Sequence, residues 1–282
     1  MSLIEHKINI QNNELEFFLE IIFRVFGYDF RNYNKAHVKR RILHRINNLE
    51  LQSISQLQHK VLYEEGYFDM ILRDLSINVT EMFRDPGFYK SMREEVIPIL
   101  RTYPYIKIWH AGCATGEEVY SFAILLQEEG LYERAQIYAT DFNPVVLEVA
   151  KKAIYPVQKI KDYTLNYQES GGKNSFSEYY VARYDSVIFD QSLKKNIVFA
   201  EHNLVTDSVF AEVNLIICRN VLIYFNKELQ NKVISLFTES LIKGGFLGLG
   251  SKENLMFTDV FNQYQVIDSK EKIYKKIVTS LK

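Results

Sequence analysis

The stretch Ala111-Gly112-Cys113-Ala114-Thr115-Gly116-Glu117-Glu118 decides how the rest of the sequence is interpreted. It follows a short apolar run, Ile106–Trp109, that is typical of a strand, and the residues that come after it, to Glu129, have the apolar spacing of a helix. Small residues after a strand let the backbone approach a ligand closely, and the first N–H groups of the next helix are free to bind it. The stretch therefore predicts a ligand-binding strand–turn–helix unit.

The chemistry of this turn separates two classes of ligand. A dinucleotide site would have Gly-x-Gly-x-x-Gly to hold a pyrophosphate, whereas the small residues here are spaced as Gly112-x-Ala114-x-Gly116. Glu117 and Glu118 would repel a phosphate and suit a ligand that is cationic or rich in hydroxyls. S-adenosylmethionine has a sulfonium, an ammonium and a ribose diol. The alternative is a tight turn whose acids complement the helix dipole.

A further carboxylate supports a nucleoside ligand. The second predicted strand, Gln136–Thr140, ends at Asp141, about 25 residues beyond the glycine turn. A carboxylate at the end of the second strand of such a unit accepts hydrogen bonds from ribose hydroxyls. The alternative is a cap for the helix that begins at Asn143-Pro144, and one residue could serve both purposes.

The remaining pattern predicts the architecture. Short apolar runs alternate with helical patterns from Ile106 to Leu249, which indicates a doubly wound, Rossmann-like α/β sheet. Two β-like runs, Tyr264–Ile267 and Lys272–Ile277, predict a terminal antiparallel hairpin. A polar stretch at about 158–196 interrupts the alternation and predicts a small antiparallel β insertion. The expected helix Lys227–Ile242 ends at Gly244-Gly245.

The first 90 residues have a helical pattern. Apolar residues recur at three- and four-residue spacing up to Gly27, which is expected to end the first helix, and Ser53 is a plausible cap for the third. We therefore expect an all-helical N-terminal domain and linker at 1–90, followed by a ligand-binding domain at 91–282.

The composition excludes several classes of protein. The 282 residues carry a formal net charge of −1, which gives no global basic field for nucleic acid. Cys113 and Cys218 are too few for a disulfide scaffold and lack the spacing of metal ligands, so we expect free thiols and no metal site. The N-terminus resembles no signal peptide, and no apolar run reaches the ~18 residues of a membrane span. We therefore expect a soluble, cytoplasmic protein.

Four ordered segments resemble the chemotaxis receptor methyltransferases of the CheR type, which esterify receptor glutamates with S-adenosylmethionine. The resemblance covers roughly residues 12–277, and the segments are Asn78–Pro86, Trp109–Ser121, Ala139–Asp141 and Cys218–Phe225. It implies a class I methyltransferase fold, glutamate methyl esters and S-adenosylhomocysteine as products. Met82, Val119 and Asn214 depart from the family pattern without removing a cofactor contact.

The resemblance also implies which residues bind the cofactor. Together with the glycine turn, these are Asn78, Thr80, Arg84, Gly112, Glu118, Asp141, Asn203, Leu204, Arg219 and Asn220. Glu118 would pair with the ammonium group of the cofactor. Arg219 and Asn220 follow the predicted strand Val213–Cys218, and an open α/β sheet keeps its ligands at the carboxyl ends of such strands.

The expected chemistry needs positioning rather than a general base. A glutamate side chain has a reference pKa of ~4.3, so it is already a carboxylate at neutral pH. We expect Arg84 and Tyr224 to hold it beside the methyl group. For Tyr224 the alternative is a core aromatic, in a chain with 19 tyrosines. The turn Arg219–Leu222 lacks the Asn-Pro-Pro-aromatic pattern of enzymes that methylate bases or amides, which makes such substrates less favoured.

The expected partner is the cytoplasmic helical region of a methyl-accepting receptor. The segment Lys35–Arg45 is basic, and Arg41 and Arg45 share a helix face, which complements the acidic methylation helices that the resemblance implies. A solvated basic face and a nucleic-acid surface are the alternatives, and the second is weakened by the net charge. The β insertion could add a receptor peptide as a strand or be a simple linker. We expect a monomer that does not insert into membranes.

Two other functions stay open. The chain could be a non-catalytic module that binds S-adenosylmethionine in a signalling assembly, or a methyltransferase of the same fold that acts on a non-chemotaxis protein or a small acid.

Overall fold

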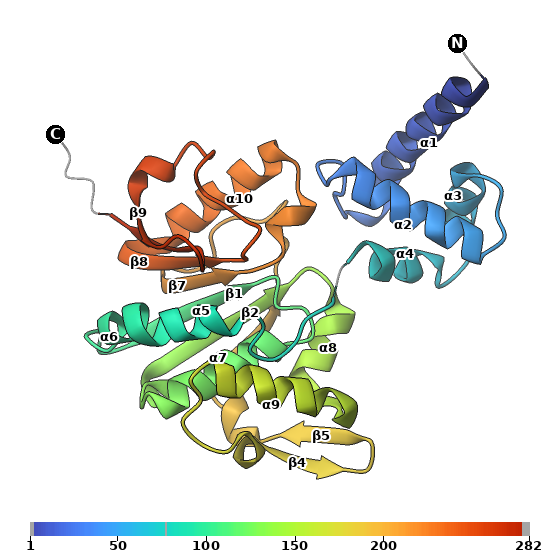
Figure 1. The fold of residues 1–282 in the computed structure, drawn as a ribbon. Coiled ribbons are helices and arrows are strands. Elements are labelled where there is room, and N and C mark those ends of the chain that lie inside the picture. The colour runs from blue at the N-terminus through green and yellow to red at the C-terminus, as the bar shows by residue number, and fades with distance from the viewer. Residues whose placement is uncertain (1–2, 77, 278–282) are drawn as a thin grey trace. The chain divides into compact units, whose positions relative to one another are not determined.

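The computed structural model describes residues 3–76 and 78–277. Its contacts divide the chain into two compact units. The N-terminal unit contains Met1–Ile77 together with Tyr224–Gln230, and the larger unit contains Asn78–Ile223 and Asn231–Lys282. Figure 1 shows the elements of both units in the colours of the chain order.

The N-terminal unit is helical, with α1 (Leu3–Phe26), α2 (Lys35–Asn48), α3 (Ile54–Tyr63) and α4 (Tyr67–Leu75). Gly27 ends α1 with φ +80°, and the Ser53 side chain accepts a hydrogen bond from Gln56 N at the start of α3, so both predicted boundaries are confirmed. The core of this unit consists of aliphatic and aromatic side chains at helical spacing, among them Leu15, Phe18, Leu19, Ile22, Val38, Ile42, Ile46, Leu57 and Leu72.

A short later segment completes this unit. Asn34 N donates to Tyr224 O at 2.7 Å, and Asn226 N donates to Asn32 O at 2.9 Å. The rings of Tyr33 and Phe225 pack edge to face with centroids 4.9 Å apart. Residues 224–230 therefore belong with the N-terminal helices although they follow most of the larger unit in the sequence.

The larger unit is built on a seven-stranded sheet in the order β6-β2-β1-β7-β8-β10-β9. The strands are β1 (Ile106–Ala111), β2 (Ala135–Asp141), β6 (Ile197–Glu201), β7 (Val213–Cys218), β8 (Leu241–Leu249), β9 (Tyr264–Asp268) and β10 (Ile273–Lys276). The first five strands of the order run parallel, and β10 is antiparallel to both β8 and β9. The predicted doubly wound sheet and its terminal hairpin are confirmed.

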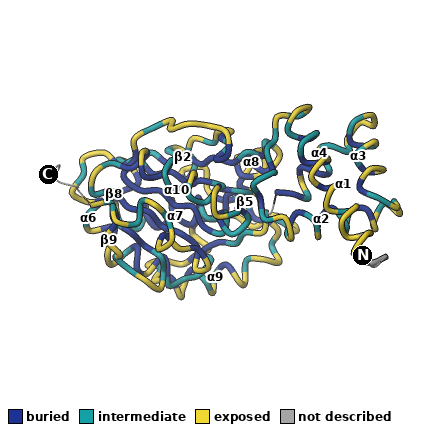
Figure 2. The backbone as a smooth tube through the Cα atoms, turned by 90° about the horizontal axis from the view of Figure 1, so that it is seen from above, coloured by how far each residue is buried: buried dark blue, intermediate teal, exposed yellow. Residues whose placement is uncertain are grey.

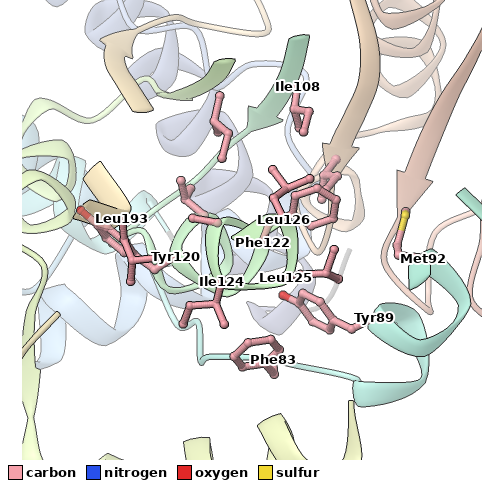
Figure 3. Packing of buried hydrophobic residues seen from close by; sticks show 14 of the residues in the cluster. Phe83, Tyr89, Met92, Ile108, Tyr120, Phe122, Ile124, Leu125, Leu126 and Leu193 are labelled. Atoms are coloured by element: carbon pink, nitrogen blue, oxygen red, sulfur yellow. The ribbon is translucent and has the colours of Figure 1, made fainter. Parts of the chain in front are cut away.

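Helices cover both faces of the sheet. Ile108 of β1 belongs to the hydrophobic cluster of α7 (Glu117–Glu128), and Figure 3 shows it beside Phe122 and Leu126. The next residue, Trp109, packs edge to face against Phe237 of α10 (Lys227–Ser240) with centroids 5.3 Å apart. Because successive strand residues point to opposite faces, α7 and α10 lie on opposite sides of β1.

The other helices and the burial of the sheet complete the unit. Helix α5 (Pro86–Ser91) continues through a π-helical turn, Met92–Val96, into α6 (Ile97–Leu100), and α8 is Pro144–Lys152. All six residues of β7 are buried, and Figure 2 shows buried stretches around α7 in the interior of the larger unit. Such complete burial is typical of a central parallel strand with helices on both faces.

Two details of the predicted elements were wrong. The helix expected to reach Ile242 ends at Ser240, and Gly244-Gly245 lie inside β8, where the pairing with β7 shifts register and Gly244 has φ +78°. The β insertion is confirmed as a sheet in the order β3-β5-β4, formed by β3 (Ile154–Pro156), β4 (Tyr180–Arg183) and β5 (Ser186–Phe189), although β3 lies before the predicted segment 158–196. It also contains a helix that was missed, α9 (Ile160–Glu169), because only Tyr163 and Tyr167 of this polar segment are buried.

Candidate functional site

The sheet topology brings the predicted site residues to one edge. From β1 the chain proceeds outward to β2 and β6, and from β7 it proceeds outward in the opposite direction to β8. The order therefore reverses between β1 and β7, which pair directly. In open α/β sheets the ligand crevice lies outside the carboxyl ends of the strands at such a switch point.

The glycine turn after β1 packs tightly against the turn after β7. Gly112 N and Cys113 N both donate to Thr140 O, at 2.8 and 2.9 Å. Gly112 has φ +78°, and a Cβ atom at this position would lie 2.6 Å from Val221 Cγ2. A residue without a side chain is therefore required where the two turns meet.

The two acids at the start of α7 have different surroundings. The Glu117 side chain is 2% exposed and accepts from Thr115 Oγ1 at 2.5 Å, and burial raises its pKa. Glu118 Oε2 accepts from Arg219 Nη1 at 2.9 Å, and Oε1 lies 3.4 Å from His110 Nδ1. Burial acts to raise the pKa of Glu118, but the His110 contact and the charge of Arg219 outweigh it and lower this pKa. Glu118 is therefore the acid that faces the turn after β7.

Arg219 is held by two carboxylates. Besides its bond to Glu118, Nη2 donates to Asp85 Oδ2 at 2.6 Å, and the guanidinium lies 4.3 Å from the centre of the Phe88 ring. The side chain is 1% exposed, and Nε has no partner within residues 3–76 and 78–277. Asp85 thereby ties the segment that precedes α5 to the edge of the sheet.

Asp141 connects two turns at this edge. Its carboxylate accepts from Ala114 N at 2.9 Å and from Asn143 N at 3.0 Å, and burial raises its pKa. Asn143 itself caps α8 by accepting from Val145 N. Asp141 thus shapes the glycine turn, and because a carboxylate oxygen can accept more than one hydrogen bond, it could also bind a ligand hydroxyl.

The turn after β6 lies beside Asp141, because His202 N donates to the Asp141 carbonyl at 3.2 Å. Asn203 Oδ1 accepts from Val205 N at 3.0 Å, and Asn203 N donates to Asp207 at 2.8 Å. Leu204 is buried. These bonds fix Asn203 and Leu204 at the same edge as the glycine turn.

The segment Asn78–Asp85 has an unusual backbone. Phe83 and Asp85 have φ of +52° and +55°, values in the left-handed region. Phe83 N donates to Ser121 Oγ at 2.9 Å, which fastens this segment to α7. Arg84 Nη1 donates to Val79 O at 3.3 Å. Asn78 and Thr80 are half-buried, and the Asp85–Arg219 pair brings this segment to the predicted site.

Tyr224 is placed in the other unit. Its carbonyl accepts from Asn34 N, and its ring lies edge to face with His37, with centroids 6.0 Å apart. Arg84 belongs to the larger unit. The joint role of Arg84 and Tyr224 therefore stays a prediction.

Three residues of this edge were not predicted from the sequence: Asp85, His110 and Glu253. Glu253 is buried and accepts from the backbone N–H groups of Gly250, Asn220 and Ile223. A signal for it was present, because Glu253 follows the strand predicted at Phe246–Leu249, as Arg219 follows β7. Asp85 and His110 gave no comparable signal, since their roles depend on contacts with Arg219 and Glu118.

The basic face of α2 is partly used inside its own unit. Arg45 Nε and Nη2 donate to the Asp74 carboxylate at 2.6 and 2.7 Å, and Arg41 Nη1 donates to the Asp74 carbonyl at 2.6 Å. Arg41 and Arg45 thus share a face, and that face holds α4. Arg40 and His44 are exposed.

The residues at the sheet edge fit S-adenosylmethionine. The glycine turn lets a ligand reach the backbone, Glu118 offers a carboxylate to an ammonium, Asp141 offers one to hydroxyls, and the unpartnered Arg219 Nε is a donor for a carboxylate. Cys113 and Cys218 are free, buried thiols whose pKa values burial raises. Within the described residues, no group of three or more His, Cys, Asp or Glu could hold a metal ion. No helix in the same part of the chain is long and apolar enough to span a membrane.

Comparisons with known proteins identify the family of both units. The chain matches the CheR methyltransferase all-alpha domain at residues 13–76 and the CheR methyltransferase SAM binding domain at residues 78–273. It is 50% identical to the Pseudomonas putida protein Cher3, over 93% of this chain and 96% of that protein. It is 28% identical to the chemotaxis protein methyltransferase of Listeria monocytogenes, over 85% of this chain and 89% of that protein.

A third relative is much longer. An uncharacterized 104.1 kDa protein of Rhodobacter capsulatus is 28% identical over 88% of this chain, which spans only 26% of that protein. One family model matches the helical unit and the other matches the unit with the sheet, so both units are assigned to the same family. The chain belongs to the CheR methyltransferase family, and its larger unit is a class I methyltransferase domain that binds S-adenosylmethionine.

Proposed function

We propose that this protein transfers a methyl group from S-adenosylmethionine to glutamate side chains of chemotaxis receptors, forming methyl esters and S-adenosylhomocysteine. The observation that carries the proposal is the charged edge between β1 and β7, where Glu118, Arg219 and Asp85 form one network within the matched family domain. The names of several relatives, which are chemotaxis protein methyltransferases, favour a receptor as the acceptor.

The cofactor would be held from several turns at once. Glu118 would bind its ammonium, Asp141 its ribose hydroxyls, and Asn203 and Leu204 its adenine, while Arg219 would face its carboxylate. Bound S-adenosylmethionine supplies an electrophilic methyl group. The burial of Glu118 and Arg219 strengthens their electrostatic interactions, because little water competes there.

The acceptor carboxylate needs orientation and loss of water rather than proton removal. Arg84 is the proposed cation for this role, since its bond to the Val79 carbonyl uses only one of the five N–H donors of a guanidinium. Tyr224 would add a hydrogen bond from its hydroxyl. Both residues follow from the family resemblance.

The proposed receptor surface is the exposed part of α2. Asp74 engages Arg41 and Arg45, so these two cations are not available to a partner. The exposed basic surface of α2 is therefore centred on Arg40. Lys35 and Lys39 contact Glu16 and Asn12 on α1 and extend the basic surface. A Glu-rich receptor helix would complement this surface electrostatically.

Transfer of labelled methyl to purified receptor cytoplasmic fragments tests the proposal. We expect label that is released as methanol in base, because esters hydrolyse and N-methyl groups do not. Arg84→Ala should lower the rate with the receptor by ~100-fold, a typical effect of losing a charged positioning contact. Wild-type turnover of this variant would contradict the role of Arg84.

The same assay separates the other functions. Tight cofactor binding without transfer would indicate a non-catalytic module. Base-stable label would exclude an ester, and transfer only to another protein or a small acid would identify a different acceptor.

A further inference from the structure

The turns after β7 and β8 leave the sheet as neighbours. Cys218 and Leu249 are register partners in the parallel pair β7–β8, so Arg219 and Gly250 are the first residues beyond it. The two turns are so close that a Cβ atom on Gly250 would lie 2.8 Å from Asn220 N. The position of one turn is therefore constrained by the other.

Glu253 joins these turns through its carboxylate. Oε2 accepts from Gly250 N at 2.6 Å and from Asn220 N at 3.0 Å, and Oε1 accepts from Ile223 N at 3.3 Å. The side chain is 4% exposed. Two of these three donors belong to the turn that carries Arg219, so one buried side chain fixes both ends of the segment Asn220–Ile223.

The turn needs such support because of its backbone. Asn220 has φ +62°, in the left-handed region that glycine adopts readily and that asparagine adopts more often than other residues but still at a cost. A conformation of this kind persists when the surrounding structure holds it in place. Here the N–H of the strained residue itself is bound by Glu253.

The surroundings of Glu253 are unusual for a purely stabilising carboxylate. Burial raises its pKa, and the N–H groups of Gly250, Asn220 and Ile223 offset this only in part. The neighbouring thiol of Cys218 is also buried, and its pKa is raised by burial and further by the charge of Glu253. Burial of this carboxylate therefore costs free energy that the N–H groups repay only in part. Its contacts fall on the turn of the proposed cofactor site.

We propose that Glu253 is a positioning residue that pre-forms the Arg219–Ile223 turn for S-adenosylmethionine. It acts through the backbone and touches neither the cofactor nor the acceptor. The inference rests on the proposed placement of the cofactor at Arg219 and Asn220, and it does not depend on the identity of the methyl acceptor.

The test measures cofactor binding alone, so it is separate from any failure of receptor methylation. Glu253→Gln keeps the size of the side chain but replaces one carboxylate oxygen with an amide N–H₂. This group donates hydrogen bonds and cannot accept them from the backbone N–H groups around it. We expect the Kd for S-adenosylmethionine, measured by titration calorimetry on the full chain, to rise roughly tenfold or more. The Kd for S-adenosylhomocysteine should rise in parallel, because the turn serves both.

Glu128→Gln is the matched control. Glu128 is a carboxylate at the far end of α7 whose side chain is 1% exposed; it pairs with Arg93 and accepts from Tyr179 OH at 3.0 Å and Lys173 N at 2.9 Å. Its loss should lower stability but leave the Kd for the cofactor within about twofold of the wild-type value. Equal effects of the two substitutions on Kd would reduce Glu253 to a general stabilising role and overturn the proposal.

A measurement on the wild type covers the case in which Glu253→Gln does not fold. Hydrogen exchange without cofactor should show the amides of Asn220, Ile223 and Gly250 protected, because the turn is already formed. Rapid exchange that becomes slow only when S-adenosylmethionine is added would mean that the cofactor, not Glu253, orders the turn, and would overturn the proposal. A folded Glu253→Gln protein with wild-type Kd would do the same.

Discussion

The turns after β1 and after β7 meet at one edge of the sheet but obtain their shapes by different means. The first contains Gly112 and Gly116, with φ of +78° and +90°, which glycine adopts readily, and Asp141 binds the N–H of Ala114, at φ +47°, between them. The second has Asn220 at φ +62°, held by a carboxylate that lies 33 residues away in the sequence. The glycines that shape most of the first turn are visible in the sequence, whereas the remote carboxylate that holds Asn220 in the second is visible only in the fold.

The largest expected effect comes from filling the first turn. Gly112→Ala combines an unfavourable φ with a Cβ 2.6 Å from Val221 Cγ2, so we expect about 2–4 kcal/mol lower stability in urea unfolding and a weaker Kd for the cofactor. Gly130→Ala is the control, since its φ is +67° but nothing lies within 4 Å of the added atom. It should lose only about 1 kcal/mol. Equal losses would show that contact between the turns is unimportant.

Removing the charge that links the two turns should have the next largest effect. Glu118→Gln leaves the buried Arg219 with only Asp85 of its two carboxylate partners, so we expect about a 10- to 100-fold rise in the Kd for S-adenosylmethionine. Glu148→Gln, at an exposed acid on α8 that pairs with Lys151, is the control and should bind normally. An unchanged Kd for Glu118→Gln would remove Glu118 from the cofactor site.

The pH dependence of stability should distinguish the acids of the two turns. The folded-state pKa of Glu253 is raised above 4.5, so its contribution to stability is present below that value and is lost as pH rises through the folded pKa. The folded-state pKa of Glu118 is lowered, so its contribution is present above 4.5 and is lost as pH falls through the folded pKa.

Urea unfolding between about pH 3 and pH 7 would measure these two contributions. The stability of the wild type relative to Glu253→Gln should fall as pH rises above about 4.5, and that relative to Glu118→Gln should fall as pH drops below about 4.5. Neither slope can exceed about 1.4 kcal/mol per pH unit for one proton. Parallel slopes would contradict the difference between the turns.

The smallest expected effect tests the strained residue directly. Asn220→Gly keeps the N–H that Glu253 binds and removes the strain, so stability should stay within about 0.5 kcal/mol of the wild type. Asn220→Ala keeps the same N–H in a conformation that alanine adopts poorly, and should lose about 1 kcal/mol. If the two variants unfold at the same urea concentration, the left-handed conformation of Asn220 does not matter for stability.

The parts of the fold that follow from local patterns could be predicted. Alternating strands and helices indicated the sheet, and the cap at Ser53 and the helix start at Asn143-Pro144 are as predicted. Helix α9 was missed because its buried side chains are two tyrosines in a polar segment, which hydropathy does not distinguish from a loop.

The positions of the site residues in the fold could be predicted from the strand ends, but the partners of their side chains could not. Arg219 follows β7 as predicted, but no local pattern showed that both Asp85 and Glu118 would pair with it. The basic run of α2 shows the same limit, because its charges are visible in the sequence but their partners are not. Its sequence does not reveal that Asp74 engages Arg41 and Arg45, which leaves Lys35 and Arg40 as exposed cations.

The pairing of residues 224–230 with residues 32–34 has a consequence for biosynthesis. A ribosome releases the N-terminal helices first, and domains generally fold as units during synthesis. Here the N-terminal unit lacks its last segment until Gln230 has been made, when most of the parallel strands have already been synthesised. The two units therefore cannot finish folding one after the other in the order of translation, and the helical unit is completed late although it is translated first.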